Sequence, residues 1–372
     1  MKGKLLFVID NLGSGGAQNQ MTLLASLLKR EGYDIEFFIY HPGDFFKYRL
    51  EELNIRIHKF EKSTKLGLAT IRQLYTLIHQ KSYDAVISFL QTPSFYTALV
   101  KHFGKSNFPL LISERFITFE KKNSLKYYFK KFSHRKASFV TTNSNHEKER
   151  LIGQGITSKD KIKTIYNVVD LDHFKPSSHH KIHQKLLCVA SVSQYKNGLC
   201  VIEAMNILKT QDKLNVSITW VGKKVFSIPE RADYIKLMED KIQNYNLKDH
   251  WSWVEPTQNI KEYYHYHDAL VHPSYREGLP NVVCESLASG LPVILSDILD
   301  HPILADQGTN GFLFKYSEPK ELAEAILQFY KLESLELREM QLKCRTFAEA
   351  NFSAKRFASE YLQIIDKIIL RV

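Results

Sequence analysis

The sequence predicts an α/β protein with two doubly wound parallel sheets, and three observations support this. Short apolar runs alternate with amphipathic helical stretches along the chain. The alternation stops at the polar segment Lys175–Lys181 and then starts again. The length of 372 residues is too great for one ordinary hydrophobic core and suits two domains. Strands joined by helices form parallel sheets, so we expect two Rossmann-like domains.

The first half contains apolar strands separated by helices. A helix is expected at Gln20–Arg30, where Met21, Leu24, Leu27 and Leu28 recur at helical spacing. The other segments of this half are the helix Ile71–Gln80 and the strands Lys4–Ile9, Ile35–Tyr40, Ala85–Leu90, Leu110–Ser113 and Ser138–Thr142.

The second half repeats this arrangement. Its expected elements are the helix Leu199–Lys209 and the strands Leu186–Ser191, Val216–Val221, Ala269–His272 and Pro292–Leu295. The segment Lys175–Lys181 is polar and contains proline, which is typical of a linker. We therefore expect an N-terminal domain at 1–176 and a C-terminal domain at 182–353. Their sheets would face each other across a cleft at the C-terminal ends of the strands.

Composition excludes several classes of protein. The apolar and charged fractions, 44% and 24%, are ordinary for a soluble globular protein. Four scattered cysteines lack C-x-x-C spacing, which argues against a zinc site or a disulfide framework and fits a reducing compartment. The first apolar run is too short for a signal peptide, and no run approaches the roughly 18 residues of a membrane span. We expect a cytoplasmic protein.

The positive charge is unevenly distributed. The net charge is +11, and residues 1–178 hold 28 basic and 16 acidic residues, a net charge of +12. The remainder therefore has a net charge of −1. This asymmetry favours an anionic partner for the first half, such as a membrane surface, a nucleic acid or a phosphorylated acceptor.

Two glutamates in the second half are the strongest candidate site residues. Glu277 lies in a loop marked by glycine and proline, and Glu285 follows with seven residues between them. Glu285 belongs to a short apolar helix that Pro280 opens and Gly290 closes. A helix N-terminus beside a strand end can bind an anion. Two carboxylates there are costly unless they bind something, and sugar or ribose hydroxyls would suit them. The alternative is a solvated loop and a helix charge satisfied by the dipole.

This block resembles the E-x7-E motif of retaining GT-B glycosyltransferases of the family-4 type, and further segments extend the resemblance over nearly the whole chain. They are the Gly-rich loop Asn11–Gln18, the turn Tyr166–Asp170, the segment Val189–Gly198, the pair Pro273-Ser274 with His272 before it, and Gly308–Phe314. A dinucleotide fingerprint is a poorer match to the Gly-rich loop. That fingerprint would need a glycine where Gln18 stands and an acidic residue where His41 stands.

The resemblance implies a GT-B fold whose last helix, at about 354–372, crosses back to the N-terminal domain. It also implies a metal-independent enzyme that uses a UDP-sugar or GDP-sugar, with UDP favoured. Glu285 would hold the ribose hydroxyls, Glu277 the hydroxyls of the transferred sugar, and Lys196 the diphosphate. Further donor-binding residues would be Gly15, Gly16, Ser191, Gly222, Gly278, Leu279 and Pro280.

The sequence departs from the family at several positions. Ser191 stands where an arginine is usual, so Lys196, helix dipoles or Lys223 would have to compensate for a missing cation. A histidine often found near the reacting sugar is absent, and its catalytic role would pass to Ser113 or Glu114. The segment Asp300–Ile303 lacks a glutamate that is often present. The pattern Asp170-Leu171-Asp172 resembles a metal motif of another fold, but we expect it to cap local turns.

A basic stretch in the first half allows two interpretations. Its lysines, Lys126, Lys130 and Lys131 among them, alternate with Leu125, Tyr128, Phe129 and Phe132 at helical spacing. One interpretation is a surface helix packed on the sheet with a solvated basic face. The other is docking on anionic lipid headgroups at the inner face of the plasma membrane, beside a lipid-linked acceptor.

We therefore expect an enzyme that transfers sugar to a hydroxyl of a lipid-linked or saccharide acceptor in surface polysaccharide biosynthesis. A nucleotide-sugar epimerase of the same fold is an alternative, although we find no acid/base set for it. A basic nucleic-acid-binding protein is a weaker alternative, because no recognition motif is present, so we expect no nucleic acid partner. The sugar, the acceptor hydroxyl and the oligomeric state stay open.

Overall fold

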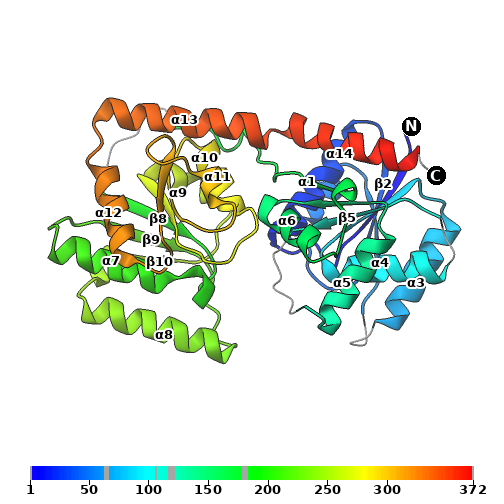
Figure 1. The fold of residues 1–372 in the computed structure, drawn as a ribbon, viewed down its shortest axis with the longest axis horizontal. Helices are drawn as coiled ribbons and strands as arrows, with labels where there is room; N and C mark the ends of the chain where they lie inside the picture. The colour runs from blue at the N-terminus through cyan, green and yellow to red at the C-terminus, as the bar shows by residue number, and fades with distance from the viewer. Residues whose placement is uncertain (1, 63–66, 105–106, 116–121, 178–182, 371–372) are drawn as a thin grey trace. The chain divides into compact units, whose positions relative to one another are not determined.

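The computed structural model describes residues 2–62, 67–104, 107–115, 122–177 and 183–370. The chain forms two compact units, one of Met1–Val168 with Ala354–Val372 and one of Val169–Ser353. Figure 1 shows that each unit contains a sheet with helices around it. The end of the predicted linker, residues 178–181, lies outside the described residues.

The first unit is built on a parallel sheet of seven strands in the order β3-β2-β1-β4-β5-β6-β7. The central strands are buried apolar runs, as a parallel sheet covered on both faces requires. The strands are β1 (Lys4–Val8), β2 (Asp34–Ile39), β3 (Arg56–Lys59), β4 (Ala85–Phe89), β5 (Leu110–Glu114), β6 (Phe139–Thr142) and β7 (Ile162–Thr164).

Helices cover both faces of this sheet, and two hydrophobic cores result. The helices are α1 (Gly16–Arg30), α2 (Lys47–Glu51), α3 (Leu68–Gln80), α4 (Gln91–Phe103), α5 (Leu125–Lys136), α6 (Asn145–Gly153) and α14 (Ala354–Ile369). One core joins α1 to α14, which buries Phe357, Tyr361 and Ile365. The other core joins α3, α4, α5 and α6 to the opposite face (Figure 1).

The second unit repeats the arrangement with a parallel sheet of six strands in the order β10-β9-β8-β11-β12-β13. The strands are β8 (Lys185–Val189), β9 (Ser217–Val221), β10 (Trp251–Val254), β11 (Ala269–His272), β12 (Val293–Ser296) and β13 (Gly311–Phe314). The helices are α7 (Gly198–Thr210), α8 (Pro229–Asn244), α9 (Ile260–Tyr266), α10 (Asn281–Ala288), α11 (His301–Leu304), α12 (Pro319–Tyr330) and α13 (Ser334–Phe352).

The two parallel sheets form the α/β architecture that the sequence predicts. Some strands at the edges of the sheets are not predicted. The edge strand β3 carries Arg56 and Lys59 and has little apolar sequence to identify it. The first segment of the first unit ends at Val168, ahead of the predicted boundary at residue 176. Residues after Val168 are held by the second unit: Arg345 donates hydrogen bonds of 3.0 and 2.8 Å to the carbonyls of Leu171 and Phe174.

No helix among the described residues combines the length and the apolar character that crossing a bilayer requires.

Candidate functional site

The second unit has a topological switch point between two neighbouring strands. β8 lies beside β11, while the chain that leaves β8 returns on its other side as β9. Ligands of open α/β sheets bind at such points, outside the carboxyl ends of the strands. The loops after β8 and β11 both leave this edge, and they lead into the N-termini of α7 and α10. Two sets of helix-terminal amides therefore lie at one edge of the sheet.

A backbone hydrogen bond joins these two loops. The amide of Tyr275 donates to the carbonyl of Tyr195 at 3.1 Å. Lys196 comes next in a single 3-10 turn, and Asn197, with φ of 56°, turns the chain into α7. The bond therefore holds Lys196 near the loop that contains Glu277.

Lys196 and Glu277 form an ion pair at the switch point. The Lys196 ammonium group donates to Glu277 Oε1, and the two side chains are only 16% and 14% exposed. His272 Nε2 lies 3.3 Å from the same oxygen. Because little water reaches these groups, their attraction is screened less than that of a surface pair.

The pKa values of this cluster follow from burial and from the ion pair. Burial favours a neutral Glu277, but Lys196 and His272 outweigh burial, so the pKa of Glu277 lies well below its usual range. Burial lowers the pKa of His272 even though Glu277 opposes the shift. The neighbouring His301, whose ring centroid lies 5.5 Å away, has a pKa lowered to about 3 by burial and then by His272. Both histidines are therefore neutral at pH 7, and Lys196 supplies the positive charge.

Glu285 lies in a different environment on α10. Its Oε2 accepts a hydrogen bond of 3.0 Å from the hydroxyl of Tyr264 on α9. Desolvation raises the pKa of Glu285 to about 7, and the Tyr264 hydroxyl offsets this only in part. Within the described residues no cation pairs with Glu285. Its carboxylate is suited to accept hydrogen bonds from ligand hydroxyls.

The other donor-binding residues predicted in the second unit lie around the same edge. Ser191 is partly buried just after β8, and Gly278, Leu279 and Pro280 are buried just before α10. Gly222 has a packing role whether or not a ligand binds. A Cβ atom there would lie 1.9 Å from the carbonyl oxygen of Ala190.

The Gly-rich loop of the first unit lies at the corresponding switch point of the other sheet. It follows β1, which lies between β2 and β4. Gly15 and Gly16 are exposed at the N-terminus of α1. Gln18 Nε2 donates to Asp10 Oδ1 at 2.9 Å and fixes the start of the helix. The loop therefore presents exposed backbone at a helix N-terminus, an arrangement suited to an anion.

The catalytic role predicted for Glu114 does not fit its position. Glu114 is 4% exposed, and its carboxylate lies 3.4 Å from Lys130 and 2.9 Å from His134. Burial opposes ionisation, but Lys130 and His134 outweigh it and lower the pKa of Glu114 to about 2. Glu114 is thus an acceptor within a buried ion-pair network and is not presented to a substrate.

Ser113, the other candidate for that role, is also enclosed. Its hydroxyl accepts hydrogen bonds of 2.9 Å from Arg115 Nε and from the Thr141 hydroxyl. Arg115 continues this network to Tyr361 on α14. Neither predicted substitute for the histidine is therefore available at the surface of the first unit.

The predicted lipid contact of Lys130 is wrong. Lys130 is 1% exposed, because its ammonium group lies between Glu114 and Glu147. The helix α5 therefore turns a charged face inward. Its aromatic face points outward instead, with Leu125 68%, Tyr128 52% and Phe129 38% exposed. Lys126 is exposed beside them and Lys131 is partly exposed, so these two lysines remain accessible.

The predicted capping role of the Asp170-Leu171-Asp172 pattern is confirmed. Asp170 Oδ1 accepts hydrogen bonds from the amides of Asp172 and His173, at 3.2 and 3.0 Å. In the part of the chain that the structure describes, no three His, Cys, Asp or Glu side chains are placed to hold a metal ion.

Sequence reasoning missed two neighbours of the glutamates. His272 is buried at the end of β11, where its ring also lies against Glu277. The Tyr264 hydroxyl binds Glu285, although Tyr264 lies 21 residues earlier in the chain. No local pattern reveals the Tyr264 contact, because it arises from the packing of α9 against α10.

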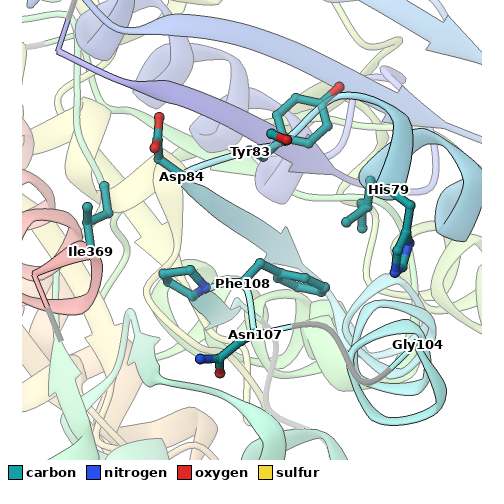
Figure 2. Close-up of a pocket in the computed structure, with 10 residues that line it drawn as sticks. His79, Tyr83, Asp84, Gly104, Asn107, Phe108 and Ile369 are labelled. Carbon is teal, nitrogen blue, oxygen red and sulfur yellow. The ribbon is translucent and has the colours of Figure 1, made fainter. Parts of the chain in front are cut away.

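A cavity of about 580 Å³ lies elsewhere, at the amino-terminal ends of β4 and β5 (Figure 2). Tyr83, Asp84, Phe108 and Ile369 are among the residues that line it. The Asp84 carboxylate already accepts a hydrogen bond of 2.6 Å from the Lys4 amide. This edge is opposite to the one where ligands bind in α/β sheets, so we do not assign it to the candidate site.

Two family models match the chain and together cover most of it. Residues 171–348 match the model "Glycosyl transferases group 1", and residues 14–173 match "Glycosyltransferase Family 4". The chain belongs to the GT-B glycosyltransferases. The family predicted from the sequence is thus confirmed.

Several proteins are similar to this glycosyltransferase in sequence. Spore coat protein SA of Bacillus subtilis is 30% identical over 241 residues, which cover 58% of this chain and 63% of that protein. A 41.2 kDa protein from the cps region of Klebsiella pneumoniae matches over 65% of its length. The chain thus spans less than two thirds of these two relatives. The amylovoran biosynthesis glycosyltransferase AmsD of Erwinia amylovora is 23% identical, with 82% and 84% of the two chains covered.

Solved structures confirm the predicted fold class. The Anabaena protein Alr3699/HepE, crystallised with UDP, has a TM-score of 0.84 at 20% identity, with 98% of this chain and 100% of that chain covered. A glycosyltransferase from Rickettsia africae also has a TM-score of 0.84, at 18% identity, with 99% of both chains covered.

The buried network around Lys130 generates a stability prediction. Lys130→Met would leave Glu114 and Glu147 without their shared cation, so we expect a loss of about 3 kcal/mol in the free energy of unfolding. Lys126→Met on the same helix is the matched control, and it should change stability by less than about 0.5 kcal/mol. Urea denaturation measures both. Equal stability of the two variants would contradict the inward orientation of Lys130.

The raised pKa of Glu285 generates a second prediction. The folded protein holds a proton on Glu285 more tightly than the unfolded chain does, so this residue destabilises the fold as pH rises through about 7. Glu285→Gln should therefore increase the free energy of unfolding at pH 8, by on the order of 2 kcal/mol. The gain should nearly vanish at pH 4.5, where Glu285 is largely protonated in the folded protein. A gain that does not depend on pH would rule out this explanation.

Proposed function

We propose that this glycosyltransferase moves a sugar from a nucleoside-diphosphate sugar, with UDP-sugar favoured, to a hydroxyl of a lipid-linked or saccharide acceptor. The product would be part of a surface polysaccharide. The observation that carries the proposal is the pairing of Lys196 with Glu277 at the switch point of the second unit.

The proposed donor contacts follow from charge and hydrogen-bonding capacity. Lys196 and the N-terminal ends of α7 and α10 would bind the diphosphate, which becomes more negative as the sugar leaves. Glu285 would accept hydrogen bonds from the ribose hydroxyls, because it has no cation of its own among the described residues. Glu277 would accept hydrogen bonds from the transferred sugar. These contacts position the donor and stabilise the leaving group.

We further propose that transfer proceeds with retention and without a metal ion, with the leaving phosphate helping to deprotonate the acceptor hydroxyl. This route needs no side-chain nucleophile, which accords with the buried, engaged state of Glu114 and Ser113. Lys223 follows Gly222 at the end of β9 and is exposed. It is our candidate for the cation that the family places at Ser191.

The relatives support the donor and acceptor classes. Crystal structures of HepE contain UDP in one case and UDP-glucose in another. AmsD is named for amylovoran biosynthesis. A Campylobacter jejuni relative, 26% identical over 310 residues, is named as an N-acetylgalactosaminyltransferase acting on a diphospho-undecaprenol saccharide. We infer an acceptor of that general class for this chain.

We also propose that the first unit docks on an anionic membrane surface through a basic aromatic patch on α5. The patch consists of Leu125, Lys126, Tyr128, Phe129 and Lys131. The exposed aromatic and leucine side chains would enter the headgroup region, and the two lysines would pair with lipid phosphates. This arrangement would keep a lipid-linked acceptor close to the enzyme.

Nucleotide binding tests the proposed activity. We expect saturable binding of UDP in calorimetric titrations, with GDP as the comparison. Glu285→Ala should weaken UDP binding by about 1.5–3 kcal/mol, or roughly 10- to 150-fold, because charge-assisted hydrogen bonds to the ribose are lost. Glu324→Ala, which changes an exposed glutamate on α12, is the control and should bind UDP normally. Absence of binding to both nucleotides would refute the proposed donor site.

Vesicle flotation tests the membrane patch. The protein should bind vesicles that contain phosphatidylglycerol and not vesicles of phosphatidylcholine alone. A Lys126→Ala/Lys131→Ala variant should lose about 2 kcal/mol of binding, or roughly 30-fold, and keep its activity on a soluble acceptor. The control Lys320→Ala/Lys331→Ala removes two exposed lysines of the second unit. Equal binding by the two variants would exclude the patch as the docking surface.

A further inference from the structure

The candidate site presents a conflict of charges. Lys196 is the cation expected to bind the diphosphate, yet its ammonium group is already paired with Glu277. Both side chains are largely enclosed, at 16% and 14% exposure. A diphosphate that takes Lys196 therefore has to compete with a carboxylate that already holds it.

The loss of Lys196 would leave Glu277 in an unfavourable state. A carboxylate with little access to water needs hydrogen bonds or a counter-charge. His272 stays beside the same oxygen at 3.3 Å, but its neutral ring can donate at most one hydrogen bond. Within the described residues the other oxygen, Oε2, accepts no hydrogen bond. When Lys196 moves to a ligand, Glu277 would therefore keep only His272 and limited water as donors unless the ligand supplies others.

The hydroxyl groups of a sugar are suitable donors for this purpose. On the proposed function above, an intact donor brings its diphosphate to Lys196 and its sugar hydroxyls to Glu277 at the same time. A free nucleoside diphosphate brings only the phosphates. The two ligands therefore differ in whether they supply hydrogen-bond donors to Glu277 after Lys196 has moved.

We propose that Glu277 is an internal competitor for Lys196, which makes the site bind an intact nucleoside-diphosphate sugar in preference to the free nucleoside diphosphate. The ion pair lowers the affinity for the nucleoside diphosphate, and the sugar relieves that effect by replacing Lys196 at the carboxylate. After transfer the sugar has left, the carboxylate recovers Lys196, and the nucleoside diphosphate is displaced.

Charge removal at Glu277 tests this inference with UDP alone. Glu277→Gln keeps the size of the side chain and abolishes the ion pair, so it should increase the affinity for UDP by roughly tenfold in calorimetric titrations. The affinity for uridine, which has no phosphate, should stay unchanged. Glu324→Gln on α12 is the control for the loss of a glutamate charge. Unchanged or weaker UDP binding by Glu277→Gln overturns the inference.

The gain must also depend on Lys196. We expect Lys196→Met to bind UDP more weakly than the wild type, and titrations at high UDP concentration keep this variant measurable. Adding Glu277→Gln to Lys196→Met should produce no further gain. An equal gain in both backgrounds would mean that Glu277 merely repels the phosphates, and the competition would be refuted. Circular dichroism spectra and melting temperatures establish that each variant is folded.

The outcomes separate this inference from the proposed function. If the wild type and Glu277→Gln both fail to bind UDP and GDP, the proposed donor site is refuted and the inference falls with it. If the wild type binds UDP and Glu277→Gln binds it no better, the donor site stands and the competition alone is refuted.

Discussion

The candidate site depends on one constraint: two neighbouring parallel strands, β8 and β11, end at the same edge of their sheet. β8 and β11 lie side by side, so their loops must meet, and the hydrogen bond between Tyr275 and Tyr195 fixes how they meet. That contact brings Lys196 against Glu277 and sets the N-termini of α7 and α10 around them. The chemistry we propose follows from this geometry, because the ion pair and two helix N-termini lie at one edge of the sheet, and Glu285 belongs to the second of these helices.

Different partners give these similarly buried carboxylates different properties. Glu277 has a cation and stays ionised, whereas Glu285 has a tyrosine hydroxyl and a pKa raised to about 7. Glu114 in the first unit is buried with Lys130 and His134 and serves the fold. The partner available to each carboxylate, more than its depth alone, decides whether it stabilises the protein or is available for a ligand.

The sequence predicts most strands of the two sheets, several of the helices and the two glutamates, because these depend on local patterns. Apolar runs identify buried strands, and glycines and prolines mark the loop around Glu277 and the start of α10. The orientation of α5 could not be predicted in this way. Its periodicity suggests an apolar face packed on the sheet, but Glu114 and Glu147 come from distant segments and draw Lys130 inward. The contact of Tyr264 with Glu285 likewise arises only when α9 and α10 pack together.

The discontinuity of the first unit bears on how the protein is made. Its chain leaves at Val168 and returns only at Ala354, and α14 contributes Phe357, Tyr361 and Ile365 to the core that β1 and α1 begin. Domains usually fold in the order in which the ribosome releases them. Here the second unit is one continuous segment, whereas the first unit cannot complete its core until α14 has been synthesised. The part of the first unit that precedes the second unit therefore completes its packing only after α14 has been made. A chain truncated before Ala354 would expose the uncovered side of that core to chaperones and proteases.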